Sequence, residues 1–182
     1  TAAGTIALLA AGLPAFDALI HVLSGISTGG FSTRSGSIGS FQSGAVNTVM
    51  IMIMILGAVN FTRYHHLRKR EERNRFFRNP QIHAMLIIIA VFALFQYLFV
   101  LGEDIATALF HSASSLTTTG FHIHPASGWS DTQKLLSSIQ MIIGGGNGST
   151  AGGIKLFRFI IILYLAGWFI RHAVLPQNTN SP

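Results

Sequence analysis

The sequence contains no cysteine and only six acidic residues among its 182 positions. The absence of cysteine excludes disulfide bonds and thiolate metal sites, and it leaves the redox compartment open. With so few carboxylates, we find no acidic pair at catalytic spacing and no serine, histidine and aspartate set for nucleophilic catalysis. The sequence therefore points away from an enzyme, and no motif in it calls for a cofactor.

Charged residues are also scarce, at 10% of the chain, whereas 49% are hydrophobic and the mean hydropathy is +0.50. This composition predicts an all-α integral membrane protein surrounded by lipid. A spanning helix needs about 20 mainly apolar residues. Ile82–Gly102 meets this requirement, Ala45–Phe61 is slightly short, and Leu135–Ile170 is interrupted in its middle. Residues 1–13 resemble the end of a further span, so we expect the chain to begin within a helix and to be a fragment.

Basic residues are concentrated between the first two predicted spans. The segment 62–81 holds Arg63, Arg68, Lys69, Arg70, Arg73, Arg75 and Arg78. Loops rich in positive charge stay in the cytoplasm, so we expect a cytoplasmic loop here, with the next span running outward. The net charge of +6 raises nucleic-acid binding as an alternative. Glu71 and Glu72 interrupt the basic run and few aromatic residues accompany it, so we expect no nucleic-acid partner.

An internal repeat relates two segments of the chain without a gap. Residues 16–40 (FDALIHVLSGISTGGFSTRSGSIGS) align with residues 106–130 (ATALFHSASSLTTTGFHIHPASGWS). Further on, MILGAVN (54–60) aligns with MIIGGGN (141–147) after a slip of three residues. Each unit is a span, a short amphipathic helix, a loop rich in hydroxyl groups and glycine, and a second span. The first segments match at Ala18/Ala108, Leu19/Leu109, His21/His111, Ser24/Ser114, Thr28/Thr118, Gly30/Gly120 and Phe31/Phe121.

The two short helices, predicted at Phe16–Gly25 and Ile105–Ser115, cannot cross a bilayer. The polar loops that follow them cannot face lipid, because each unpaired backbone group there would cost several kcal/mol. Each segment must therefore enter the membrane and return, and irregular backbone at that depth is tolerated where it lines a water-filled path. The repeat predicts two re-entrant pore loops.

The residue types in these loops suit a dehydrated potassium ion. Backbone carbonyl groups, supported by threonine hydroxyls, replace the ion's water oxygens without burying a full negative charge. Glycine permits the backbone angles that this requires, and the C-terminal end of each short helix carries roughly half a negative charge, which favours a cation. An ordinary surface turn is the alternative, which we disfavour because turns do not usually recur within matching helical frames.

Three stretches, ISTGGFST, LTTTGF and IGGGNGSTAGGIKLFR, resemble the membrane subunit of Trk/Ktr-type potassium uptake systems. That superfamily has four tandem span–pore-loop–span repeats similar to those of potassium channels. The resemblance covers nearly the whole chain, and GSTAGGIK after the second loop makes it specific. It implies that residues 1–61 are the second repeat with a truncated first span, 62–81 a basic cytoplasmic loop, 82–172 the third repeat and 173–182 a cytoplasmic linker to a fourth. A ring of four loops would then be incomplete, so we expect this chain alone not to conduct.

The same resemblance implies potassium uptake across the bacterial inner membrane by a multi-pass, non-enzymatic transporter. Its implied partners are membrane lipid, a second copy in a homodimer and a cytoplasmic nucleotide-binding regulatory subunit (TrkA/KtrA-like). Sodium or mixed monovalent-cation transport is the alternative. Glycine in both loops disfavours it, because serine there is associated with sodium selectivity in related plant proteins. The implied potassium filter consists of Ser27, Thr28, Gly29, Gly30 and Phe31 with Thr117, Thr118, Thr119, Gly120 and Phe121.

The interruption in the third apolar run is a second candidate site. Glycine costs about 1 kcal/mol at an interior helix position, so this stretch should unwind the span into a flexible peptide below the filter. We interpret it as a gate, and the resemblance implies that the regulatory subunit moves it. A phosphate-binding loop is the alternative, but the Gly-Lys-Ser/Thr ending is missing. The gate comprises Gly144, Gly145, Gly146, Asn147, Gly148, Ser149, Thr150, Ala151, Gly152 and Gly153, together with Lys155.

Two kinds of polar side chain near the candidate sites allow more than one interpretation. Lys155 is expected to hold the loop closed or to limit cation entry, whereas Arg158 is expected to extend to the interface. A third metal ligand is not evident near the His-x-His pair 122–124, so a solvated loop is favoured over a metal site. His21 and His111 occupy equivalent places in the repeat, where packing or hydrogen bonding is the default expectation.

Overall fold

The computed structural model describes residues 1–65, 78–100 and 104–174, and every regular element within them is helical. The first repeat contains α1 (Ala2–Ala10), α2 (Ala15–Ile26) and α3 (Gly44–Ala58). The second contains α6 (Pro80–Phe99), α7 (Ile105–Leu116) and α8 (Asp131–Ile143), followed by α9 (Leu156–Val174). Short 3₁₀ turns lie at Ser37–Phe41, Phe61–Arg63 and Ala126–Gly128. The all-helical fold class predicted from the sequence is confirmed for these residues.

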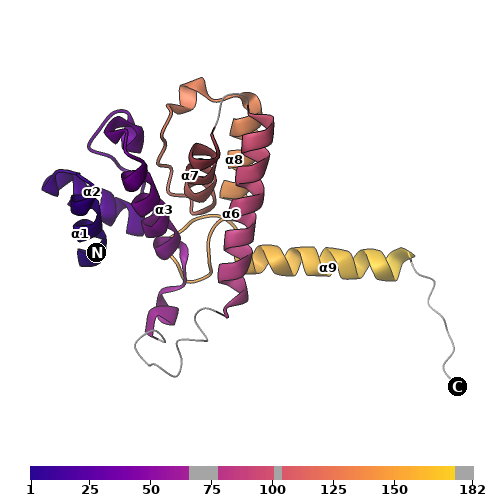
Figure 1. Ribbon diagram of the computed structural model, residues 1–182. Coiled ribbons are helices and arrows are strands. Elements are labelled where there is room, and N and C mark those ends of the chain that lie inside the picture. The colour runs from indigo at the N-terminus through magenta and orange to yellow at the C-terminus, as the bar shows by residue number, and fades with distance from the viewer. Residues whose placement is uncertain (66–77, 101–103, 175–182) are drawn as a thin grey trace, which may run out of the picture.

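The two repeats pack side by side (Figure 1). The short helices α2 and α7 have 12 residues each, and α7 lies between α3 of the first repeat and α6 and α8 of its own. The C-terminal helix α9 leaves the body of the molecule at a steep angle (Figure 1). The repeat found in the sequence is therefore a structural repeat of short helices held inside longer ones.

Side-chain caps account for where the longer helices begin. Ser43 and Ser130 each accept a hydrogen bond from the backbone three residues ahead, at the start of α3 and α8. Asn79 caps α6, whose first residue is Pro80, the position at which proline costs no hydrogen bond. Helix α3 ends at Ala58, three residues before the end of the predicted apolar run.

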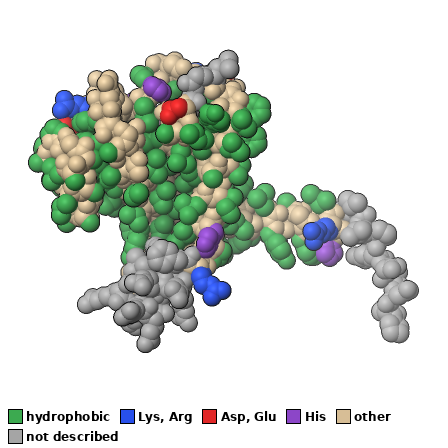
Figure 2. Space-filling view, in the orientation of Figure 1, with side chains coloured by type: hydrophobic (Ala, Val, Ile, Leu, Met, Phe, Trp, Pro, Cys, Tyr) green, Lys and Arg blue, Asp and Glu red, His purple; other side chains and the backbone are tan. Residues whose placement is uncertain are grey.

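Apolar side chains fill the space between the repeats and also cover the outside. Phe110, Phe121, Met50 and Met54 are fully buried between α2, α3 and α7. Large apolar side chains are exposed along α6 and α9, and they dominate the visible surface (Figure 2). Among the described residues, α6 is the helix long and apolar enough to cross a membrane, whereas α2 and α3 are apolar but shorter. An outer surface of this kind suits lipid and not water.

Candidate functional site

The short helices α2 and α7 end in the same unusual way. The residue after each C-cap, Thr28 and Thr118, has a left-handed backbone, with φ of 51° and 54°. The next amide donates back to the carbonyl group five residues earlier, from Gly29 to Ser24 over 2.8 Å and from Thr119 to Ser114 over 2.9 Å. This is a Schellman ending, which normally places glycine in the left-handed position. A threonine there costs about 1 kcal/mol or more, and the strain occurs twice at the same place.

Glycine occupies a second left-handed position two residues further on in each loop. Gly30 has φ of 69° and Gly120 has φ of 87°. The alternation prevents both loops from continuing as helix or strand. Within the described part of the chain, the carbonyl oxygens of residues 28–30 and 118–120 accept no hydrogen bond. Unpaired backbone carbonyls are rare inside proteins, so each loop presents a row of oxygen atoms that an ion can use.

The two loops, 90 residues apart in sequence, meet in space. A Cβ added to Gly30 would lie 2.0 Å from the carbonyl oxygen of Thr119, so only glycine allows this approach. Further along, the amide of Gly39 donates to the carbonyl group of His122 over 3.2 Å. The residues predicted as two parts of one filter therefore lie together and not on separate faces.

Burial differs between the two loops. Thr117 and Thr119 are buried, and their hydroxyl groups share a hydrogen bond of 2.7 Å. The equivalent residues of the first loop, Ser27 and Gly29, are exposed. The second loop has a further hydrogen bond that the sequence did not predict. The hydroxyl group of Ser114 donates to the carbonyl group of Phe121 over 2.7 Å.

The glycine-rich loop between α8 and α9 lies against both repeats. Its amide at Gly146 donates to the carbonyl group of Ala58 over 2.9 Å, and its carbonyl group at Gly148 accepts from Phe61 over 3.1 Å. The hydroxyl group of Thr150 lies 2.8 Å from the carbonyl oxygen of Ile26, at the end of α2, and 3.0 Å from that of Gly57. Residues 146, 148 and 150 of the loop thus each form a hydrogen bond with the first repeat.

The same loop also reaches the second candidate filter segment. The amide of Gly152 donates to the hydroxyl group of Thr118 over 2.5 Å. The loop is closed at its base by bonds from Ile154 to Ile142 and from Leu156 to Gly145, each of 2.9 Å. These contacts join the two sites that the sequence suggested separately.

Lys155 folds back over the loop that precedes it. Its backbone is left-handed, with φ of 78°. Its ammonium group donates to the carbonyl groups of Ala151 and Ser149. Since both are carbonyl groups of the glycine-rich loop, the side chain ties the loop to the start of α9. Arg158, one turn further on, is exposed.

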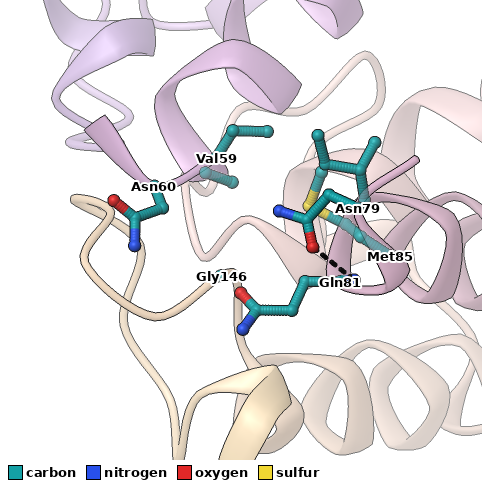
Figure 3. Close-up of a pocket in the computed structure, with 8 residues that line it drawn as sticks. Val59, Asn60, Asn79, Gln81, Met85 and Gly146 are labelled. Carbon is teal, nitrogen blue, oxygen red and sulfur yellow. Dashed lines mark hydrogen bonds between the residues drawn. The ribbon is translucent and has the colours of Figure 1, made fainter. Parts of the chain in front are cut away.

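The end of α3 is the part of this site that the sequence did not indicate. Residues Ala58, Val59 and Asn60 line a small cavity of about 10 Å³, with room for about one water molecule. Figure 3 shows Asn60, Asn79 and Gln81 placed around it, with Gly146 of the glycine-rich loop on one side. Asn79 accepts the amide hydrogen of Gln81 over 3.0 Å. The junction between α3, α6 and the loop therefore combines three amide side chains with the apolar side chains of Val59, Ile82 and Met85.

An ion pair lies beyond the first filter segment. Asp17, in the first turn of the non-spanning helix α2, accepts hydrogen bonds from the Thr33 hydroxyl group over 2.7 Å and from the Arg34 guanidinium over 2.8 Å. These two bonds hold the pKa of Asp17 below its ordinary value, so the carboxylate remains charged at neutral pH. In the described residues we find no group of three side chains placed to bind a metal, including around His122 and His124.

Comparison with known proteins places this geometry in a family. Residues 5–102 and 84–181 each match the TrkH family, which is described as a cation transport protein. The chain belongs to the TrkH family. Family members are integral membrane transporters and not enzymes.

Relatives in the TrkH family match most of this chain. The Trk system potassium uptake protein TrkH of Halomonas elongata is 33% identical over 87% of the chain, and that of Salmonella typhimurium is 29% identical over all of it. The crystal structure of the potassium transporter TrkH from Vibrio parahaemolyticus superposes with a TM-score of 0.88 at 28% identity over the whole chain. The chain spans 34%, 39% and 41% of the length of these three proteins.

Proposed function

We propose that residues 27–31 and 117–121 are two segments of a selectivity filter through which a transporter takes up potassium across the bacterial inner membrane. The observation that carries this proposal is the paired geometry of the loops. Both have left-handed residues at the same two positions, and Gly30 approaches the carbonyl group of Thr119. Both also have consecutive carbonyl oxygens that accept no hydrogen bond from the described residues. Carbonyl oxygens held in this way replace the water around a potassium ion. The names of the TrkH relatives support potassium as the substrate.

The glycine-rich loop 144–153, with Lys155, is proposed as the gate. Its support is position, because the loop bonds to Thr118 at one end of its path and to Ile26 below the other short helix. A rearrangement of the loop would break these bonds and uncover the inner end of both filter segments. We further propose that a cytoplasmic nucleotide-binding subunit moves the loop and that the transporter is a homodimer. Residues 1–61 and 82–172 are proposed as its second and third repeats.

Gly120→Ser tests the filter directly. Rubidium and sodium uptake are measured in cells that lack their own potassium import and carry the complete gene. Because Gly120 has φ of 87° and no atom within 4 Å of an added Cβ, serine fits in space but strains the backbone. We expect the ratio of rubidium to sodium uptake to fall about tenfold, which corresponds to roughly 1.4 kcal/mol of lost discrimination.

Gly128→Ser is the matched control for this experiment. It makes the same substitution in the same repeat, where the backbone is ordinary and an added Cβ also meets nothing within 4 Å. We expect unchanged uptake of both ions. Equal discrimination in the Gly120 and Gly128 variants would contradict the filter, and sodium uptake above rubidium uptake in the unmodified protein would replace potassium with sodium as the substrate.

A further inference from the structure

Two histidines lie behind the candidate filter at equivalent positions of the repeat. His21 on α2 and His111 on α7 are both fully buried. Neither belongs to the filter or the gate proposed above. Each ring instead contacts the chain that leaves the filter, at Ser32 in the first loop and at Ile123 in the second.

The protonation of His111 follows from its partners. The backbone amide of Ile123 lies 3.2 Å from Nε2, and a backbone amide can only donate, so Nε2 carries a lone pair. A ring that accepts through Nε2 carries its hydrogen on Nδ1. The side-chain amide of Gln133, from α8, lies 3.1 Å from Nδ1. The structure places the Gln133 amide nitrogen at this position, and a hydrogen on Nδ1 requires the amide to be rotated so that its oxygen accepts instead.

His21 has the same arrangement with different partners. Its Nδ1 lies 2.6 Å from the carbonyl oxygen of Asp17, which can only accept, so Nδ1 carries the hydrogen. In the neutral ring Nε2 then accepts from the hydroxyl group of Ser32, 2.8 Å away. The Ser32 oxygen accepts in turn from the amide of Arg34 over 3.1 Å. In both repeats, Nε2 faces the chain beyond the filter glycine.

We propose that His21 and His111 are positioning residues that fix the outer end of each filter segment and thereby determine how well the filter discriminates potassium from sodium. The inner end of each segment is fixed by the Schellman bonds of Thr28 and Thr118, whereas the carbonyl groups between the ends have no partner. The second fixed point is the contact with the histidine, at Ser32, two residues after Gly30, and at Ile123, three residues after Gly120. Discrimination between ions of similar charge depends on the number and placement of these oxygens. The inference rests on the proposed filter.

The test compares variants of His111 in the complete protein, with the rubidium-to-sodium uptake ratio and the apparent KM for rubidium as readouts. His111→Leu removes the acceptor and should lower the ratio about tenfold, the effect of one buried hydrogen bond. His111→Gln retains an acceptor at the position of Nε2 and should keep the ratio within about twofold of the unmodified protein. His83→Leu is the control, because His83 is exposed on α6 and bonds only to Asn79 at the helix start.

Variants of the first repeat provide an independent measurement if the His111→Leu protein fails to reach the membrane. Ser32→Ala and His21→Leu each remove one partner of the equivalent bond in the first repeat. The single serine variant should lower the ratio severalfold, and adding His21→Leu to it should lower the ratio no further, because both remove one interaction.

The outcomes separate this inference from the filter itself. A normal ratio in His111→Leu and Ser32→Ala, with a lowered ratio in Gly120→Ser, would overturn the role of the histidines and leave the filter in place. A normal ratio in Gly120→Ser as well would contradict the filter. Loss of discrimination in His111→Gln equal to that in His111→Leu would also overturn the inference, because ring packing and not the acceptor would then be responsible.

Discussion

The two candidate filter loops share a motif but differ in their surroundings. Phe121 is 1% exposed, and its ring lies 5.9 Å from that of His21 on the first repeat's short helix. The equivalent Phe31 is 77% exposed. The hydrogen bonding of the serine behind each loop differs as well. The Ser114 hydroxyl group bonds to the Phe121 carbonyl group, whereas the Ser24 hydroxyl group is buried without a partner among the described residues.

This difference shows that the burial of a filter loop depends on contacts with the adjacent repeat. The phenylalanine of the second loop packs against the short helix of the first repeat, and its carbonyl group is turned toward Ser114. Among the described residues, no such helix covers Phe31, and the Ser24 hydroxyl group has no bond like that of Ser114. Since the local sequences match at these positions, the surroundings and not the residues account for the two states.

The largest effect on uptake is expected from Gly30→Ala, and its comparison with Gly120→Ala distinguishes the roles of the two filter glycines. An alanine Cβ at Gly30 would lie 2.0 Å from the carbonyl oxygen of Thr119, a distance at which the backbone must move. We expect a cost of more than about 4 kcal/mol and no measurable rubidium uptake. Gly120→Ala meets no atom and should cost only the strain of its positive φ, about 1–2 kcal/mol. Equal uptake in the two variants would mean that the loops do not touch.

Phe121→Ala should destabilise the chain far more than Phe31→Ala. Removing the buried ring leaves a cavity beside His21 and should lower the free energy of unfolding by about 3–5 kcal/mol. Removing the exposed ring should change it by less than about 1 kcal/mol. Denaturant unfolding of residues 1–182 in detergent measures both. A loss for Phe31→Ala that appears only in the complete protein would show that another segment covers this ring there.

Part of this arrangement could be predicted from the sequence because it depends on local patterns. The repeat located both short helices, and the glycine run located the break between α8 and α9. The contacts of the loop with Ala58 and Phe61 were not predictable, because they depend on how α3 packs against a segment 90 residues later. The different environments of Ser24 and Ser114 were not predictable either, since they depend on contacts with segments distant in sequence.

Ser114→Ala and Ser24→Ala test the serine difference directly. Removing the Ser114 hydroxyl group leaves the buried carbonyl group of Phe121 without a donor, so we expect a loss of about 1–2 kcal/mol in unfolding free energy. The Ser24 hydroxyl group has no partner among the described residues, so alanine there should be neutral or slightly stabilising. Circular dichroism during denaturant unfolding of residues 1–182 gives both values. An equal loss of unfolding free energy in the Ser24 and Ser114 variants would show that the serine hydroxyl group stabilises both loops to the same extent.

The smallest effect concerns the loop beneath the filter, which contacts the two repeats by different groups. Next to the filter, its Thr150 side chain bonds to Ile26 at the end of α2, and its Gly152 amide bonds to Thr118 after α7. Thr150→Val removes only the first contact and keeps the shape of the side chain. If the loop is a gate, the closed state should lose about 1 kcal/mol, and rubidium uptake without the regulatory subunit should rise roughly fivefold. Thr48→Val on α3, whose exposed hydroxyl group bonds only within its own helix, is the control. An unchanged basal rate in Thr150→Val would mean that the contact with α2 does not hold the loop closed.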